Sequence, residues 1–352
     1  MIIKKGTEVL DNLENKFRGC LIGGAVGDAL GYAVEFMNEN EIFSKYGERG
    51  ITEYSMTRGT ALISDDTQMT MFTAAALIDG LSSGNYLDSI SRGYLGWYKT
   101  QTGGAVTADD NTQIGKLLRI SGLYSRRAPG VTCLSALGSG KIGTIENPIN
   151  NSKGCGGVMR VAPIGLMFAN GSFPAVTQNE IDMLGAKAAA ITHVHELGYI
   201  PAAALVHIIN FLTRHERYTI VDSVAESTLA MHKLFGDTEN VKLFHRLMER
   251  SVELAEDGTD DLTAIHELGE GWVAEETLAI AVYCAVKYQN DFEKAICAAV
   301  NHNGDSDSTG AVCGNILGTF LGYDKIPQKF KENLEFHDLL IDIADELVIC
   351  SP

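Results

Sequence analysis

The chain is poor in proline, in basic residues and in paired cysteines. Only seven of its 352 residues are proline, so long stretches contain no helix breaker and helices are favoured over strands. Against 45 Asp and Glu stand 28 Lys and Arg, for a net charge of −17, so a polyphosphate partner would bring no gain from counterion release. The seven cysteines include no CxxC pair and no Cys/His cluster at zinc spacing, which is typical of a reducing compartment. The composition therefore argues against nucleic acid as a partner and against zinc.

Membrane signals are missing as well. No stretch reaches about 18 uncharged apolar residues, the length of a membrane span. The first residues, MIIKKGTEVLDNLENKF, carry charges spaced too closely for the apolar core of a signal peptide. We therefore expect a soluble, cytoplasmic protein that does not enter a membrane. A monomer is expected because no coiled-coil heptad or exposed apolar stripe stands out.

Helical periodicity is the main secondary-structure signal in this sequence. Apolar residues recur at helical spacing in 67–79, 181–192, 200–213, 223–235, 273–288 and 308–321. Period-2 alternation is rare, and the turn-rich stretches are 99–112, 125–160 and 255–271. The sequence therefore predicts an all-α fold.

Glycines recur at every fourth residue in two places. They are Gly23, Gly27 and Gly31 near the start, and Gly310, Gly314, Gly318 and Gly322 near the end. At this spacing they line one face of a helix. A glycine inside a helix costs roughly 1 kcal/mol relative to alanine, so we expect these faces to permit close contact between buried helices.

Two acidic clusters, 64–67 (SDDT) and 305–309 (DSDST), each precede a predicted helix. Helix capping explains either cluster alone, since Ser, Thr and Asp satisfy the free N–H groups at a helix N-terminus. Together they offer four carboxylates, which would repel one another if they were brought close without a cation. Oxygen ligands without His or Cys select Mg²⁺, Mn²⁺ or Ca²⁺, and two such ions about 3.5–4 Å apart can orient and activate water. One metal centre shared by both clusters would require a single domain.

These stretches, with others between them, resemble the ADP-ribosylglycohydrolase family, and more closely its dinitrogenase reductase-activating glycohydrolase branch. The matching motifs follow the family's order over nearly all of the chain: FRGCLIGGAVGDALGYAVEF from residue 17, then SDDTQMT, GCGGVMRVAP, THVH, GWVAEETLAIA and NHNGDSDSTGAVCGNILG. The resemblance implies an all-α helical bundle in which an N-terminal extension, 1–16, precedes a single domain, 17–352. It also implies two Mg²⁺ ions, with Mn²⁺ as a substitute, in a cleft that binds ADP-ribose.

The resemblance carries specific site residues with it. The family's metal-ligand positions fall on Ser64, Asp65, Asp66, Asp305, Asp307 and Ser308. Serine stands at 64 and 308 where the family more often has threonine, and it keeps the oxygen donor. Glu35 falls where many members have a glutamate near the metals, where it would position water or gate the cleft.

The glycine-rich motif and the THVH motif complete the predicted substrate site. Gly154, Gly156 and Gly157, followed by Met159, could expose backbone N–H groups to a diphosphate; a tight turn is the alternative explanation. Cys155 stands where the family usually has asparagine. The resemblance places His193 beside the bound ribose or phosphate, whereas His195 is expected to be structural.

Several other patterns are weaker evidence for a functional site. The pair His193 and His195 does not predict zinc, because alternate helical residues point apart and no third nitrogen ligand is evident. The stretch 138–143 (GSGKIG) matches GxGxxG but follows no strand, so it predicts no nucleotide site. The pair Glu275 and Glu276 is explained by the helix dipole, although the resemblance makes Trp272 or Glu275 a possible ligand contact. Asp109 and Asp110 resemble a region in which the arginine-specific branch has a functional aspartate, without a clear correspondence.

The predicted activity is hydrolysis of the N-glycosidic bond that joins ADP-ribose to arginine in a modified protein. Carboxylates stabilise the oxocarbenium-like charge that develops on the ribose, and the predicted catalytic residues are Glu35, Asp65 and Asp305; one of the aspartates at 109 and 110 is the alternative to Glu35 as proton acceptor. The alternatives are a hydrolase of serine-linked ADP-ribose or of a small ADP-ribose metabolite, a non-catalytic protein on the same fold, or a protein that blocks an ADP-ribosyltransferase toxin, with segment 1–16 as the contact.

Overall fold

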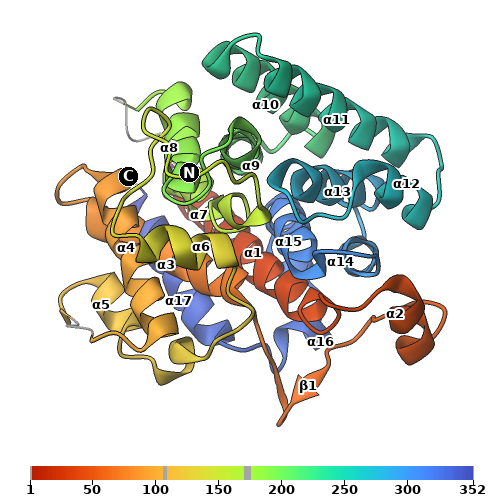
Figure 1. Cartoon of the computed structure of the whole chain (residues 1–352), viewed down its shortest axis with the longest axis horizontal. Coiled ribbons are helices and arrows are strands. Elements are labelled where there is room, and N and C mark those ends of the chain that lie inside the picture. Colours follow the sequence, from red (N-terminus) through yellow and green to blue (C-terminus); the bar gives the residue numbers. More distant parts are fainter. Residues whose placement is uncertain (1, 106–108, 170–175, 352) are drawn as a thin grey trace.

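The chain folds into an assembly of helices with one short β-hairpin (Figure 1). The computed structural model describes residues 2–105, 109–169 and 176–351, with side chains from Leu10 onward. The hairpin pairs β1 (Met56–Thr57) with β2 (Thr60–Ala61). The helices are α1 (Ile2–Gly31), α2 (Glu39–Tyr46), α3 (Asp65–Gly80), α4 (Tyr86–Thr102), α5 (Gln113–Leu117), α6 (Val131–Gly138), α7 (Ala162–Met167), α8 (Gln178–Ala190), α9 (Glu196–Arg214), α10 (Ile220–Phe235), α11 (Glu239–Glu256), α12 (Asp261–Leu268), α13 (Ala274–Lys287), α14 (Phe292–Val300), α15 (Ser306–Leu321), α16 (Gln328–Lys331) and α17 (His337–Cys350), with 3₁₀ turns at Ser121–Tyr124, Cys155–Gly157 and Tyr323–Lys325. The predicted all-α class is confirmed.

The glycine-lined helices α1 and α15 lie side by side at the centre of the fold (Figure 1). They run antiparallel, because Gly27 faces Gly310 whereas Gly31, one turn later, faces Ser306. A Cβ atom at Gly27 would lie 1.9 Å from the carbonyl O of Gly310, and one at Gly31 would lie 2.2 Å from that of Ser306. The predicted close contact between glycine faces is thus confirmed. Its consequence is that the end of α1 meets the start of α15.

Other helices surround this pair. Helix α3 packs against α4, the C-terminal helix α17 packs against α1, and α13 and α14 cover α15. Helix α9 packs against α8, α10 and α13, and the α10–α11 hairpin lies on the outside (Figure 1). Helix α9 is long and apolar enough to cross a membrane, but 89% of its apolar window is buried inside the structure. It is explained as a core helix of the bundle.

The six predicted helices are all present, as α3, α8, α9, α10, α13 and α15. The prediction of turn-rich structure was wrong in part, because α4 extends to Thr102 and because 125–160 and 255–271 contain α6 and α12. Helix α12 is only eight residues long and begins after Asp260, whose side chain accepts a hydrogen bond from the Thr263 amide. Gly322 does not belong to the glycine face of α15; it ends the helix with φ +83°, a conformation that side chains disfavour.

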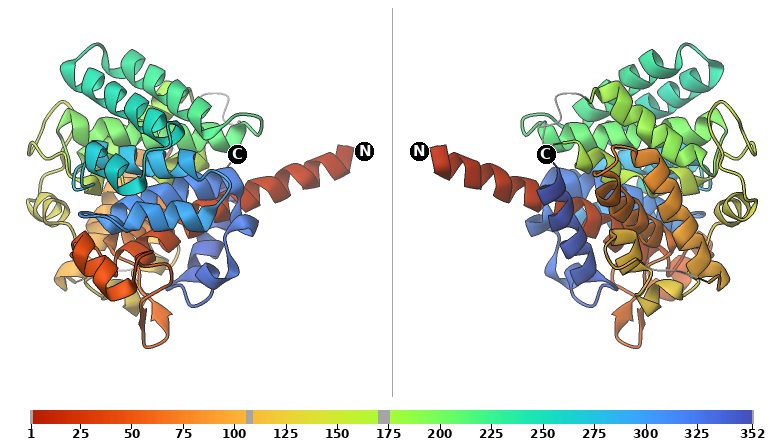
Figure 2. Two further views of the ribbon diagram at one scale, coloured as in Figure 1. Left: turned by 90° about the vertical axis from the view of Figure 1, so that its right-hand side faces the viewer. Right: turned by 90° about the vertical axis from the view of Figure 1, so that its left-hand side faces the viewer.

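The N-terminal turns of α1 extend away from the rest of the molecule (Figure 2). Helix α1 runs without a break from Ile2 to Gly31, so the predicted boundary between residues 16 and 17 falls inside it. The division into an extension and a domain stays a prediction.

Candidate metal and active site

A cavity of ≈ 450 Å³ opens where α1 ends and where α3 and α15 begin. It is lined by residues that lie far apart in the sequence but are brought together by the α1–α15 contact. They are Glu35, Phe36, Asp65, Asp66, Ala128, Pro129, Gly130, Val131, Thr132, Cys133, Gly154, Cys155, Gly156, Met159, His193, Trp272, Asp305, Asp307 and Ser308. The predicted catalytic residues and most of the predicted ligand residues therefore share one cavity.

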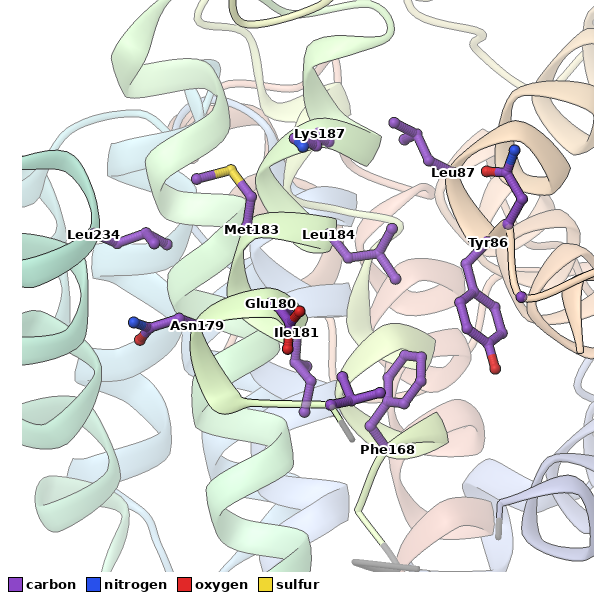
Figure 3. Close-up of a pocket in the computed structure, with 13 residues that line it drawn as sticks. Tyr86, Leu87, Phe168, Asn179, Glu180, Ile181, Met183, Leu184, Lys187 and Leu234 are labelled. Atoms are coloured by element: carbon purple, nitrogen blue, oxygen red, sulfur yellow. The ribbon is translucent and has the colours of Figure 1, made fainter. Parts of the chain in front are cut away.

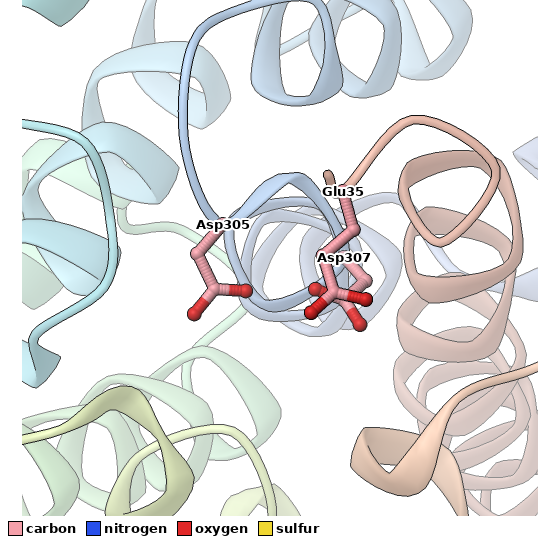
Figure 4. A group of neighbouring side chains, drawn as sticks. All are labelled: Glu35, Asp305 and Asp307. Carbon is pink, nitrogen blue, oxygen red and sulfur yellow. The ribbon is translucent and has the colours of Figure 1, made fainter. Parts of the chain in front are cut away.

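Three carboxylates converge at one end of this cavity. Glu35, in the turn after α1, lies opposite Asp305 and Asp307 at the start of α15, and one oxygen of each lies within 4.8 Å of the others (Figure 4). Asp305 occupies the N-cap position of α15, yet its side chain makes no capping hydrogen bond. The capping explanation is therefore wrong for Asp305, whose carboxylate is available to a ligand.

The first acidic cluster joins the second through a direct hydrogen bond. Ser308 Oγ donates to Asp66 Oδ2 at 2.8 Å, and the Gly130 amide donates to Asp65 Oδ2 at 3.1 Å. Ser64 differs from the others, because its hydroxyl caps α3 by accepting from the Asp66 amide at 3.2 Å and is not exposed to the cavity. The structure thus brings the six predicted metal-ligand residues into one region, with Ser64 at its edge.

A further carboxylate, Asp28, lies behind the cluster and was missed by the sequence analysis. It is fully buried on α1 and accepts hydrogen bonds from the Ser64 amide (2.8 Å), the Thr67 amide (3.1 Å) and the Thr67 hydroxyl. These bonds fix the N-terminus of α3 against α1. The available signal was an acidic residue within the otherwise apolar run LIGGAVGDALG, where a buried charge requires partners.

Burial and mutual repulsion shape the electrostatics of the cluster. Burial, followed by the charge of Asp307, raises the pKa of Glu35 to about 10 and that of Asp28 to about 7. The same two causes raise the pKa of Asp65, Asp66 and Asp305 well above the usual range. No Lys, Arg or His forms an ion pair with any of these carboxylates in the part of the chain that the structure describes. Without a cation, several of them must carry protons at neutral pH.

The donor set fits a hard divalent cation. All of the converging side chains offer oxygen, and Glu35 Oε2 is buried without a hydrogen-bond partner among the described residues. Mg²⁺, Mn²⁺ and Ca²⁺ prefer carboxylate and hydroxyl oxygens. A bound cation would satisfy Glu35 and offset both the burial of these charges and their mutual repulsion, the two causes of the raised pKa values.

The glycine-rich turn forms another wall of the cavity. Gly154, Gly156 and Met159 line it, whereas Gly157 lies behind them, against the Gly198 carbonyl. The Cys155 amide already donates to the Trp272 carbonyl O at 3.1 Å and the Gly154 amide to Ser152 Oγ at 3.3 Å, so a backbone anion site here would have to use other amides of the turn. His193 faces Gly154 and Gly156.

Two exposed aromatic rings flank the cavity. Phe36 and Trp272 stack with their centroids 6.4 Å apart and their planes at 22°. Glu275 pairs with Lys153, and its Oε2 has no hydrogen-bond partner among the residues that the structure describes; it does not line the cavity. Of the two possible ligand contacts, Trp272 is therefore the one that reaches the cavity.

The remaining sequence candidates lie elsewhere. Asp109 bonds to Asn111 and Asp110 pairs with Arg119, and neither aspartate lines the cavity. His195 is structural, as predicted, because its Nδ1 caps α9 by accepting from the Leu197 amide at 3.0 Å. The GxGxxG match at 138–143 follows helix α6 rather than a strand, which agrees with its rejection as a nucleotide site.

A larger cavity of ≈ 570 Å³ lies between α4 and α8 (Figure 3). Its lining is mostly apolar, with Tyr86, Phe168 and Leu184 among the larger side chains. The charged lining residues are Glu180 and Lys187, and Glu180 is already bonded to Thr177. The described residues of this cavity therefore include no converging catalytic groups, in contrast to the acidic one.

Comparison with known proteins agrees with the geometry. The sequence model of the family described as ADP-ribosylglycohydrolase matches residues 10–351. The chain is 26% identical to an uncharacterized protein of Archaeoglobus fulgidus (95% of this chain and 96% of that one). It is 24% identical both to ADP-ribosylhydrolase ARH3 of Mus musculus (91% and 88%) and to the ADP-ribosyl-(dinitrogen reductase) glycohydrolase of Rhodospirillum rubrum (92% and 92%). A solved structure described as an ADP-ribosylglycohydrolase-related protein complex shares the fold, with a TM-score of 0.67 at 22% identity over 97% of this chain and 100% of that one.

Proposed function

Because the chain belongs to the ADP-ribosylglycohydrolase family, we propose that it is a metal-dependent hydrolase that releases ADP-ribose from modified arginine in proteins. Family membership supports hydrolase activity on ADP-ribosylated substrates. The main structural support is the convergence of Glu35, Asp305 and Asp307 in a cavity that also contains Asp65 and Asp66. Such a concentration of unpaired buried carboxylates is expected where a cation binds.

We propose two Mg²⁺ ions as the cofactor, with Mn²⁺ as a possible substitute. The residues that would hold them are Asp65, Asp66, Asp305, Asp307 and Ser308, which line the cavity; the sixth predicted ligand, Ser64, would have to bind a cation while its hydroxyl caps α3. When bound, such ions act as Lewis acids toward oxygen and lower the pKa of water. The arrangement supports this assignment because every one of these side chains offers oxygen.

The chain's own carboxylates supply the rest of the proposed chemistry. Cleavage of the N-glycosidic bond develops positive charge on the ribose ring, which Asp65 and Asp305 would stabilise from the cavity wall. Glu35 Oε2 has no hydrogen-bond partner among the described residues, so Glu35, once nearby cations keep it ionised, can accept the proton of the attacking water. The C–N bond breaks with its electron pair going to nitrogen, the water oxygen bonds to the anomeric carbon, and the departing guanidine takes up the proton that Glu35 accepted, leaving as the guanidinium of unmodified arginine.

The charge of the cavity favours arginine over serine as the acceptor. Five carboxylates line the cavity, on Glu35, Asp65, Asp66, Asp305 and Asp307. If bound cations keep all five ionised, they carry one negative charge more than two divalent cations neutralise. The surplus attracts a cationic guanidinium and gives no comparable advantage to a neutral serine hydroxyl. On the other side of the cavity, Gly154, Gly156, Met159 and His193 would bind the ADP-ribose, with Gly157 behind them.

The decisive experiment compares two modified substrates. Purified protein is incubated with arginine-ADP-ribosylated and with serine-ADP-ribosylated protein, in Mg²⁺ or in a chelator, and the released ADP-ribose is measured. We expect release from the arginine conjugate, lost in the chelator and restored by Mg²⁺ or Mn²⁺. Release from the serine conjugate alone would overturn the arginine assignment, and release unaffected by the chelator would overturn the metal requirement.

The cellular setting is also part of the proposal. All seven cysteines are free thiols, which supports a reducing, cytoplasmic location. The monomeric state stays a prediction, as does contact of residues 1–16 with an ADP-ribosyltransferase toxin. A variant that lacks both Asp65 and Asp305 but still protects cells from such a toxin would support direct blocking.

A further inference from the structure

Arg160 is an unusual buried cation directly behind the substrate cavity. It is fully buried, and no carboxylate pairs with it in the described part of the chain. Its guanidinium lies 4.1 Å from the centre of the Tyr94 ring, and Nη1 contacts the sulfur atoms of Met69 and Cys133. An unpaired buried charge is expensive, so its position calls for an explanation beyond packing.

The strongest contact of Arg160 leads toward the cavity. Its Nη2 donates to Thr192 Oγ1 at 2.6 Å, and Thr192 Oγ1 lies 2.8 Å from His193 Nδ1. The Thr192 hydroxyl has one proton, and the alternative acceptor, the Ala189 carbonyl, is 3.4 Å away. Because Arg160 already donates to Thr192 Oγ1, the Thr192 hydroxyl is polarised as a hydrogen-bond donor. Its nearer acceptor is His193 Nδ1.

The other ring nitrogen of His193 faces the cavity. Nε2 has no hydrogen-bond partner among residues 2–105, 109–169 and 176–351, and it lies 3.3 and 3.2 Å from the positions that Cβ atoms would take at Gly154 and Gly156. The two glycines therefore leave this nitrogen uncovered. Burial, with the charge of Arg160, lowers the pKa of His193 to about 3, so the ring is neutral at physiological pH.

We propose that Arg160 and Thr192 are positioning residues that hold His193 in the tautomer with its proton on Nε2, as a neutral hydrogen-bond donor to the bound ligand. Resting on the proposed function, this inference names the acceptor as a phosphate or ribose oxygen of ADP-ribose. The assignment removes His193 from acid–base chemistry, because Nδ1 is engaged by Thr192 and Nε2 does not give up its proton. It also accounts for the buried charge of Arg160.

The first test is ¹⁵N NMR of the histidine rings in the intact protein, from pH 6 to 8. His193→Gln identifies the His193 signals by their disappearance. We expect a protonated Nε2 and an unprotonated Nδ1 that do not change over this range. A proton on Nδ1, or titration of the ring within the range, would overturn the inference whatever the substrate is.

The second test removes the Thr192 hydroxyl. Thr192→Val keeps the shape of the side chain but deletes the hydrogen-bond donor, so we expect both histidine tautomers in the spectrum. The affinity for ADP-ribose should weaken by about 3- to 10-fold, and KM should rise by a similar factor with little change in kcat. Thr192→Ser should restore the spectrum and the affinity. Arg160→Met should resemble Thr192→Val.

A matched control separates positioning from stability. Thr319→Val deletes an equally buried hydroxyl that donates to the Asn315 carbonyl at 2.7 Å, far from the cavity. It should lower the melting temperature about as much as Thr192→Val but leave the histidine spectrum and the affinity unchanged. If Thr192→Val matches this control in every measurement, the positioning role is refuted. If wild-type protein has the expected tautomer but does not bind ADP-ribose, the proposed function fails while the tautomer assignment stands.

Discussion

Asp28 offers the sharpest test of how the fold builds the metal site. It is fully buried and accepts from the amides of Ser64 and Thr67, so it connects α1 to the segment that carries Asp65 and Asp66. Asp28→Ala would leave both amides without acceptors. A buried donor that loses its partner costs about 1–3 kcal/mol, so we expect the free energy of unfolding to fall by about 2–6 kcal/mol.

Asp28→Asn separates the hydrogen bonds from the charge. An asparagine oxygen at the Oδ2 position can still accept from the Ser64 and Thr67 amides, both at 3.1 Å, while the shorter bond from Ser64 to Oδ1 and the negative charge are lost. Repulsion from Asp307 contributes to the raised pKa of Asp28, so removal of the charge relieves strain in the metal-free protein. We therefore expect a change of less than about 2 kcal/mol in unfolding free energy, with weakened Mg²⁺ binding because the cluster has lost one charge.

Urea unfolding in a chelator measures the stability, and titration calorimetry measures the Mg²⁺ affinity. Asp79→Ala is the matched control, because Asp79 also accepts from two backbone amides, those of Gln113 and Ile114, but lies at the far end of α3. The control should lose stability and retain wild-type Mg²⁺ affinity. Wild-type stability and affinity in Asp28→Ala would refute the idea that this carboxylate organises the site.

Three further outcomes are expected. Asp305→Asn should lower the rate of ADP-ribose release by at least about 100-fold, comparable to the loss of one strong electrostatic stabiliser, and should abolish the calorimetric response to Mg²⁺; unchanged turnover would contradict the site. Gly27→Ala should lower the free energy of unfolding, measured in urea, by about 1–3 kcal/mol, because its Cβ would lie 1.9 Å from a backbone atom. Gly96→Ala in α4 is the control and should not destabilise the protein, because the nearest atom would lie 3.5 Å from its Cβ. Equal effects would argue against the close helix contact. In a chelator, the folded protein keeps a proton on Glu35 (pKa about 10), whereas the unfolded chain has lost it. The free energy of unfolding should therefore fall between pH 6.5 and 8 by about 1.4 kcal/mol per pH unit for each retained proton. Mg²⁺ should reduce this slope, and identical slopes with and without Mg²⁺ would refute the electrostatic argument.

The helices were predictable because their apolar faces are periodic. The expected range 273–288 became α13, Ala274–Lys287, and the expected range 200–213 became α9, Glu196–Arg214. The predicted helix starts lie a few residues too late in the chain where a polar first turn precedes the apolar stripe. Helix α10, for example, begins three residues before the predicted 223 because Thr219 and Asp222 form a capping box.

The site was only partly predictable, because sequence shows which groups are present but not which way they point. The acidic motifs identified Asp65, Asp66, Asp305 and Asp307, although helix capping was the favoured explanation for either cluster alone. The conformation at the start of α15 decides this for Asp305, whose side chain is left without a capping bond. The tertiary contacts of Asp28 have no counterpart in a local pattern, so that residue was missed.

The packing of α1 on α15 and the chemistry of the cavity are two aspects of one arrangement. Glycine at the contact lets the helices approach until carbonyl groups limit the distance, and this approach places Glu35 against Asp305 and Asp307. Burial, and after it the charge of Asp307, raises the pKa of Glu35 and of Asp305, so this arrangement costs free energy in the absence of a cation. Helix packing must supply that free energy in the metal-free protein, and a bound cation returns it. Metal affinity and fold stability are therefore coupled through the same helix contact, so a substitution that separates α1 from α15 should weaken Mg²⁺ binding even though it touches no ligand.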